Sequence, residues 1–229
     1  KLHIKVAHVE AGLRSFNMDM PEEVNRILTD RISDYLFCPT DSAVKNLKNE
    51  GYDNIDTKII RTGDVMQDAA MFYAQKSEQK SSVISEIGLE KFALATLHRA
   101  ENTDELQQLS RACETINKVN KEIPVIIPAH PRLLKRLNSF NLNFDCKLVS
   151  PQSYFQMLYM LKECAFVMTD SGGLQKEAYW SGKFCITLRE QTEWTELVDH
   201  GYNFLTGLSS TKVNMVLKKL KNQKNELIW

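Results

Sequence analysis

The stretch that decides the fold reads Ala165-Phe166-Val167-Met168-Thr169-Asp170-Ser171-Gly172-Gly173-Leu174-Gln175-Lys176-Glu177-Ala178. Residues 165–169 form an apolar run of strand length, and residues 173–181 carry apolar side chains at helical spacing. A strand that turns through Ser-Gly-Gly into a helix is typical of parallel α/β sheets, and glycines let the backbone approach an anion at the helix start. Ser171, Gly172 and Gly173 are therefore predicted to bind phosphate. The alternative is a tight turn in which Ser171 or Asp170 only caps the helix.

The same alternation extends outward in both directions. The pattern predicts strands over residues 4–7, 57–61, 92–97, 125–128, 147–149, 165–169 and 184–188, and helices over 21–36, 103–121, 132–139, 154–162 and 173–181. A polar stretch at 75–85 is the best candidate for a linker. We therefore expect an α/β protein with two Rossmann-like domains. Residues 1–72 would be the C-terminal half of the first, and residues 73–229 the second, nucleotide-binding domain.

Composition excludes several classes of function. Lys plus Arg equals Asp plus Glu at 29 each, so no basic excess favours nucleic acid or a membrane surface as a partner. The five cysteines are scattered without a C-x-x-C pair, which argues against a disulfide framework or a zinc site and favours the cytoplasm. No signal peptide or apolar run of membrane-spanning length is present. The sequence suggests no metal and no organic cofactor.

Polar residues follow other predicted strands at the edge where ligands bind in parallel α/β sheets. His98 and Arg99 follow residues 92–97, His130 follows 125–128, and Arg189 follows 184–188. His98 and Arg99 suit recognition of a diphosphate or stabilisation of a leaving group, although the loop could merely cap the next helix. Glu177, little more than one turn from the glycines, is expected to accept hydrogen bonds from a ribose.

Acidic residues gather near the first strand of the chain. Glu10 ends the strand in a segment that also holds Arg14, and Glu22 and Glu23 open the next helix. Clustered carboxylates raise one another's pKa, which suits proton transfer. Taken singly, each could instead be a solvated surface charge.

Together these segments resemble the non-hydrolysing UDP-N-acetylglucosamine 2-epimerase family. The matching segments, in the family's order and spacing, are His-Val-Glu-Ala-Gly-Leu-Arg-Ser (8–15), Pro-Glu-Glu-Val-Asn-Arg (21–26), Gly-Asp-Val-Met-Gln-Asp-Ala (63–69), His-Arg-Ala-Glu-Asn (98–102), Pro-Ala-His-Pro (128–131), Thr-Asp-Ser-Gly-Gly-Leu-Gln-Lys-Glu-Ala (169–178) and Leu-Arg-Glu-Gln-Thr-Glu (188–193).

The resemblance implies a GT-B-like pair of domains and inversion at C2 of a UDP-activated 2-acetamido sugar, by elimination of UDP to a glycal and re-addition. It implies that Glu10 and Glu22 are the acid–base carboxylates and that His98 steadies the leaving UDP. Ser171, Gly172, Gly173 and Glu177 are implied as the UDP site. Arg14, Arg99, Arg189 and His130 are further implied contacts of the UDP-sugar. A homodimer is also implied, through the first domain.

The chain departs from the family at both ends. It lacks the opening Gly-Thr-Arg-Pro-Glu segment, the catalytic Asp of a Gly-Asp motif and the C-terminal glycine-rich segment, so we expect it to be a fragment. Lys176 and Trp194 are more similar to the branch acting on UDP-2,3-diacetamido-2,3-dideoxyglucuronate. Lys176 could complement a uronate, but a solvated helix-surface lysine is the expected state.

Other functions share this pattern. A GT-B glycosyltransferase with a UDP-sugar donor would share the nucleotide end but need an acceptor pocket. An inactive UDP-sugar-binding fragment, and a hydrolysing epimerase that lets water capture the intermediate, remain alternatives.

Overall fold

The computed structural model describes residues 4–77, 88 and 91–222. The chain forms two compact units, unit 1 (Lys1–Ala69) and unit 2 (Ala70–Trp229). This division falls within helix α3 (Val65–Ser77), close to the predicted boundary between residues 72 and 73. Of the predicted linker, residues 75–77 are helical and residues 78–85 lie outside the described part of the chain.

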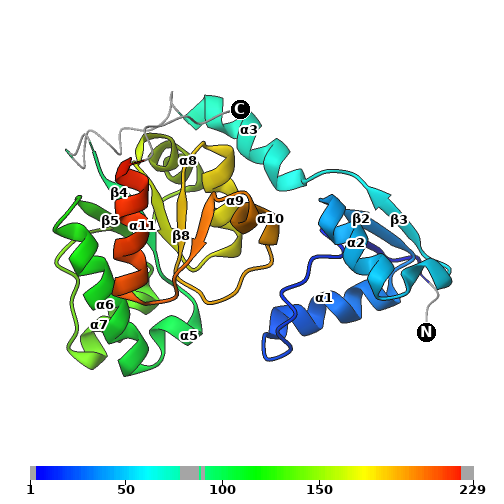
Figure 1. The fold of residues 1–229 in the computed structure, drawn as a ribbon, viewed down its shortest axis with the longest axis horizontal. Coiled ribbons are helices and arrows are strands. Elements are labelled where there is room, and N and C mark those ends of the chain that lie inside the picture. The colour runs from blue at the N-terminus through cyan, green and yellow to red at the C-terminus, as the bar shows by residue number, and fades with distance from the viewer. Residues whose placement is uncertain (1–3, 78–87, 89–90, 223–229) are drawn as a thin grey trace. The chain divides into compact units, whose positions relative to one another are not determined.

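Unit 1 holds a parallel sheet of order β1-β2-β3, formed by β1 (Ala7–Val9), β2 (Tyr35–Cys38) and β3 (Lys58–Arg61). Its other elements are α1 (Pro21–Ile32), α2 (Asp41–Asn49) and the 3-10 turn η1 (Tyr52–Asn54) (Figure 1). Thr40 caps α2 by accepting a hydrogen bond from the Ala43 backbone N–H.

The predicted helix over 21–36 is too long. Helix α1 ends at Ile32, Ser33 is extended, and Leu36 is a buried residue of β2. The backbone N–H groups of Asp34 and Tyr35 donate to Val6 O, which starts the pairing with β1. The apolar pattern continued across the boundary because a buried strand happened to keep the helical spacing, and Ile32 itself is 71% exposed.

Unit 2 is a six-stranded parallel sheet of order β6-β5-β4-β7-β8-β9. Its strands are β4 (Ala93–Thr96), β5 (Val125–Pro128), β6 (Lys147–Val149), β7 (Val167–Thr169), β8 (Cys185–Thr187) and β9 (Asn203–Leu205). Counted within the unit, the order is 3-2-1-4-5-6, the Rossmann order. The expected α/β class with parallel sheets is confirmed.

Helices cover both faces of this sheet (Figure 1). They are α5 (Ala100–Thr103), α6 (Leu106–Asn120), α7 (Pro131–Phe140), α8 (Tyr154–Glu163), α9 (Gly172–Trp180), α10 (Thr195–Asp199) and α11 (Ser210–Asn222). One buried apolar cluster joins α6, α7 and α11 to one face, and a second joins α8, α9 and Ala70 of α3 to the other. The helix predicted over 103–121 is two helices, because α5 ends at Thr103 and α6 starts at Leu106.

Candidate functional site

The site lies where the strand order of unit 2 reverses, between β4 and β7. Ligands of open α/β sheets bind at this switch point, outside the carboxyl ends of the strands. His98 and Arg99 follow β4, and Asp170 and Ser171 follow β7. The ends of the two strands are joined directly, because the hydroxyl oxygens of Thr96 in β4 and Thr169 in β7 lie 2.6 Å apart.

Asp170 is the buried centre of this junction. Its carboxylate accepts from the backbone N–H groups of His98 (3.1 Å) and Arg99 (3.0 Å) and from the Asn102 side chain (3.1 Å). Arg99 Nε donates back to Asp170 O at 3.0 Å. Burial raises the pKa of Asp170, but the hydrogen bond from His98 and the other donors outweigh it and leave the pKa lowered. Asp170 therefore carries a negative charge that fixes the loop after β4.

His98 is anchored on one side and exposed on the other. Its Nδ1 lies 3.0 Å from Asp170 Oδ1, and its side chain is 53% exposed. The hydrogen bond that the ring donates to Asp170 raises the pKa of His98 above 6.5, against the opposing effect of burial. A partly exposed imidazole with a raised pKa and a fixed orientation can carry the positive charge that a leaving diphosphate requires.

Ser171, Gly172 and Gly173 form the start of α9. Ser171 is the N-cap and accepts from the Leu174 backbone N–H at 3.4 Å. The two interpretations of the sequence are compatible, because an N-cap serine leaves the other first-turn N–H groups and the helix dipole to face an anion. These three residues are partly exposed, as a ligand site requires.

The loop after β8 holds this helix start in place. Trp194 Nε1 donates to Gly172 O at 2.9 Å, and a Cβ on Gly172 would collide with the Glu193 carboxylate. The buried amide of Gln175 donates to Ser171 O and accepts from Thr192 and Asn203. Gly172 is therefore favoured by close packing against the loop after β8.

Glu177 lies on the second turn of α9 and is partly exposed. Burial raises its pKa, partly offset by a hydrogen bond from the Tyr154 hydroxyl. The pKa of Tyr154 is raised to about 12 by burial and by the Glu177 charge, so the phenol remains a donor at neutral pH. A carboxylate can accept hydrogen bonds from hydroxyl groups through its remaining lone pairs. The contact of Glu177 with a ribose stays a prediction.

The remaining predicted residues of unit 2 differ in accessibility. Arg189 is buried and pairs with Glu193 at 3.1 Å. His130 is exposed after β5 and caps α7, its Nδ1 accepting from the Arg132 N–H. Their roles stay predictions.

The expectation of a solvated Lys176 is wrong. Its side chain packs with Nζ 3.9 Å from the centre of one ring of Trp194 and 5.4 Å from that of Trp180, and the residue is only 4% exposed. The indole faces attract the ammonium group, and its aliphatic stem is buried with them.

In unit 1, Glu10 follows β1 and Glu22 lies exposed in the first turn of α1. Glu10 has φ of 67°, in the left-handed region that costs a non-glycine residue about 1–2 kcal/mol. Glu23, the third member of the predicted acidic cluster, is buried and accepts from the backbone N–H groups of Ser15 and Phe16 and from Arg26.

The expectation of a mutually raised pKa fails for Glu23. Burial raises the pKa of Glu23, but the hydrogen bonds from Ser15, Arg26 and Phe16 outweigh it and leave the pKa lowered. Glu23 therefore shapes the loop, while the predicted catalytic roles of Glu10 and Glu22 stay predictions.

Arg14 is enclosed within unit 1. Its guanidinium contacts Asp30 at 2.8 Å and donates to both carboxylate oxygens of Glu50 at 2.7 and 2.8 Å. The residue is 2% exposed, so the structure gives it a role in holding its own loop. Its predicted contact with the UDP-sugar stays a prediction.

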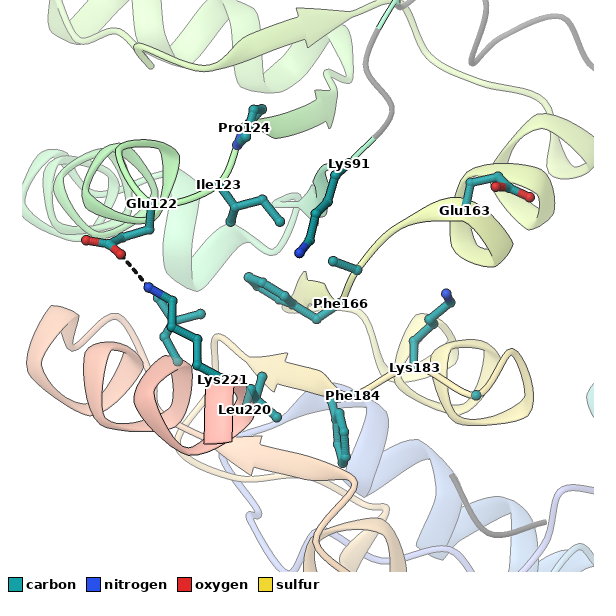
Figure 2. Close-up of a pocket in the computed structure, with 13 residues that line it drawn as sticks. Lys91, Glu122, Ile123, Pro124, Glu163, Phe166, Lys183, Phe184, Leu220 and Lys221 are labelled. Carbon is teal, nitrogen blue, oxygen red and sulfur yellow. Dashed lines mark hydrogen bonds and ion pairs between the residues drawn. The ribbon is translucent and has the colours of Figure 1, made fainter. Parts of the chain in front are cut away.

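A cavity of about 760 Å³ opens at the opposite, amino edge of the sheet in unit 2 (Figure 2). The cavity is lined by the charged residues Lys91, Glu163 and Lys183 and by Phe166 between them. Two further lining residues form an ion pair, with Lys221 Nζ 2.6 Å from Glu122 Oε2. Parallel sheets bind ligands at the other edge, so this cavity is separate from the candidate site.

Within residues 4–77, 88 and 91–222, no helix is both long and apolar enough to cross a membrane. The same described residues contain no group of three or more His, Cys, Asp or Glu side chains that could hold a metal ion.

Sequence reasoning missed the residues that position the site. Asp170 was considered only as a cap, and Asp30, Tyr154 and Trp194 were not assigned a role in it. A signal existed for Asp170, because a carboxylate directly after a fully buried strand needs donors from the neighbouring strand end. The others depend on contacts between residues 16 or more positions apart, which spacing does not reveal.

Comparison with known proteins agrees with this geometry. A family model described as UDP-N-acetylglucosamine 2-epimerase matches residues 1–228. The UDP-2,3-diacetamido-2,3-dideoxy-D-glucuronate 2-epimerase of Pseudomonas aeruginosa is 50% identical over 208 residues, which cover 90% of this chain and 58% of that protein. A UDP-N-acetylglucosamine 2-epimerase of Methanococcus maripaludis is 43% identical, with coverage of 98% and 64%.

Among solved structures, the Methanocaldococcus jannaschii UDP-GlcNAc 2-epimerase in complex with UDP-GlcNAc and UDP has a TM-score of 0.89 and 40% identity, over 96% of this chain and 63% of that one. The chain thus spans about 58–64% of the length of these relatives. The family match covers nearly every residue, from the strand before Glu10 to helix α11. This chain belongs to the UDP-N-acetylglucosamine 2-epimerase family.

Proposed function

We propose that the full-length protein containing this chain epimerises C2 of a UDP-activated 2-acetamido sugar. The observation that carries the proposal is the helix start Ser171–Gly173 beside the anchored His98, at the β4/β7 switch point. The names and sequence identities of the relatives support this chemistry for the proposed diphosphate site.

The proposed reaction proceeds in two halves. A carboxylate removes the C2 proton while the C1–O bond to UDP breaks, which leaves a C1=C2 double bond and free UDP. A proton is then delivered to the other face of C2 as the UDP oxygen re-forms its bond to C1. Proton transfer is assigned to Glu10 and Glu22, because a carboxylate can both accept and return a proton.

The residues of unit 2 hold the nucleotide in this proposal. The N–H groups of Gly172 and Gly173, the Ser171 hydroxyl and the helix dipole bind the diphosphate, whereas the Ser171 N–H donates to Thr169 Oγ1 at 2.9 Å. Glu177 accepts from the ribose. Protonated His98 stabilises the charge that develops as UDP leaves, with Arg99, Arg189 and His130 near the nucleotide. We further propose that the protein acts in the cytoplasm, where nucleotide sugars are used, and as a homodimer.

The substrate is proposed to be the 2,3-diacetamido uronate derivative. The relative bearing that name is 50% identical, against 43% for the M. maripaludis enzyme named for UDP-N-acetylglucosamine. Buried Lys176 makes no direct uronate contact in this proposal, since both indoles cover it. It stabilises the helix that carries the diphosphate site.

The test is incorporation of solvent deuterium. The full-length protein is incubated in heavy water with UDP-N-acetylglucosamine and, separately, with the UDP-2,3-diacetamido uronate, and the sugars are examined by mass spectrometry and NMR. Deuterium at C2 and a second epimer are expected, with a larger kcat/KM for the uronate. Sugar transfer without exchange would identify a transferase, free sugar and UDP a hydrolysing enzyme, and no reaction with either sugar would contradict the proposal.

A further inference from the structure

Asp30 is a buried carboxylate near the end of α1 to which the proposed mechanism gives no task. Its side chain is 0% exposed and makes contacts at three points. His8 Nδ1 lies 2.6 Å from Oδ1, the Gly12 backbone N–H donates to Oδ2 at 3.1 Å, and the Arg14 guanidinium lies 2.8 Å from Oδ2. Burying a charge is costly unless it is fully paired, and here three donors satisfy it.

These contacts surround Glu10 along the chain. His8 lies two residues before it, Gly12 two residues after it and Arg14 four residues after it. Glu10 itself has φ of 67°, a conformation that an L-residue holds only where its surroundings impose it. Asp30 therefore contacts the chain on both sides of Glu10, the residue with the left-handed backbone conformation.

Contacts that do not involve Asp30 also hold the chain on each side of Glu10, and before it His8 and Val9 pair with Leu36 and Phe37 of β2. The Ala11 N–H donates to Phe37 O at 3.0 Å, and the Asn46 side chain donates to Gly12 O at 3.0 Å. Gly12 also has positive φ, and a Cβ there would collide with the Ala43 carbonyl. Asp30 adds what these contacts do not, a link from the strand residue His8 across Glu10 to the packed loop.

We propose that Asp30 is a positioning residue that sets the direction of the Glu10 carboxylate for proton transfer at C2. This inference rests on the proposed function. Asp30 holds the backbone of Glu10 in the left-handed conformation, so that the carboxylate has one orientation when the sugar binds. Asparagine cannot replace it, because its amide offers one acceptor oxygen and places N–H donors among groups that are themselves donors.

A purely structural role makes a different prediction. If Asp30 only stabilised unit 1, its replacement would lower the melting temperature but would not act through Glu10. Groups that act together in one step show non-additive effects when both are changed, whereas independent effects multiply. A double-mutant cycle with Glu10 therefore separates positioning from stability.

The experiment compares the full-length wild-type protein, Asp30→Asn, Glu10→Gln and the double variant in the heavy-water assay. A misplaced catalytic group can cost about 100-fold, so Asp30→Asn is expected to lower kcat for exchange by about 10- to 100-fold with little change in KM. The slow exchange that remains in Glu10→Gln is measured at high enzyme concentration. It should differ by less than about twofold from that of the double variant, because Asp30 then has no Glu10 carboxylate to position.

Glu50→Gln is the matched control. It removes the other acidic partner of Arg14 without touching His8 or Gly12, and is expected to lower the melting temperature while leaving kcat within about threefold. If Asp30→Asn does not fold, His8→Leu replaces it, because it removes only the contact before Glu10; a drop in kcat of about tenfold is then expected.

Three results would overturn the inference. The first two are wild-type kcat in Asp30→Asn and wild-type kcat in a folded His8→Leu. The third is that Asp30→Asn lowers exchange by the same factor in the wild-type protein and in Glu10→Gln. Failure of the proposed function looks different, because the wild-type protein itself would then show no deuterium at C2.

Discussion

At the scale of single residues, the imidazole of His98 has one nitrogen fixed by Asp170 while half of its side chain remains exposed. The hydrogen bond that His98 donates to Asp170 raises the His98 pKa above 6.5, so the ring holds its proton more tightly in the folded protein. Its contribution to stability is fully present below pH 6.5 and is lost as the pH rises through the higher folded-state pKa. The affinity for an anionic ligand beside His98 should likewise be highest at low pH and fall as the pH rises through the His98 pKa.

The first prediction is therefore a pH-dependent affinity. Binding of UDP-N-acetylglucosamine, measured by calorimetry from pH 6 to 9, should weaken about three- to tenfold as the pH passes through the raised pKa of His98. A nucleotide sugar is the better probe, because its diphosphate has no free terminal oxygen that titrates near neutral pH. In His98→Gln the affinity should be lower and flat with pH; an unchanged slope in this variant would show that another group titrates.

The residue scale is also where sequence reasoning was least complete. His98 and the Ser171–Gly173 turn could be predicted, because each follows an apolar strand and strand ends of a parallel sheet share one edge. Lys176 was misjudged, because a charged residue in isolation is most often solvated, and Asp170 was considered only as a helix cap. Their burial depends on groups supplied by other elements: Asn102 of α5 donates to Asp170, and the Trp194 indole covers Lys176.

At the scale of elements, the start of helix α9 depends on the loop after β8. A Cβ on Gly172 would displace the Glu193 carboxylate, which is buried and paired with Arg189 at 3.1 Å. Overpacking of this kind costs about 1–3 kcal/mol. Gly172→Ala is expected to lower both the melting temperature and the affinity for UDP, the latter by about tenfold, since about 1.4 kcal/mol corresponds to a factor of ten.

Ser181→Ala, at the opposite end of α9, is the control for this variant. It should leave UDP affinity unchanged in calorimetry, because no part of the predicted site lies there. Tight UDP binding by Gly172→Ala would mean that the diphosphate is not held at this helix start.

Elements were predictable where their apolar pattern was uninterrupted. The five strands predicted in unit 2, over residues 92–97, 125–128, 147–149, 165–169 and 184–188, contain β4 to β8. The helix over 21–36 was overextended, because Leu36 kept the spacing of α1 although its backbone belongs to β2. Pairing with β1, decided by residues about 28 positions earlier, overrides the local pattern.

At the scale of the whole molecule, the proposal divides the reaction between the two units. The predicted acid–base carboxylates lie in unit 1, and the predicted UDP site lies in unit 2. Neither unit therefore suffices for the chemistry, although nucleotide affinity should come mainly from unit 2. A variant in unit 1 should then separate catalysis from binding.

Glu22→Gln in the full-length protein tests this division. Glu22 is exposed, so we expect the Glu22→Gln variant to fold normally. The neighbouring Glu23 differs, because its carboxylate accepts hydrogen bonds from the backbone N–H groups of Ser15 and Phe16. Loss of an acid–base group typically costs about 100- to 10,000-fold, so exchange at C2 should fall by this factor while UDP affinity stays within about twofold. Glu23→Gln should instead lower the melting temperature, because it weakens buried hydrogen bonds. If Glu22→Gln weakened UDP binding as much as exchange, Glu22 would belong to the nucleotide site and the division between units would be wrong.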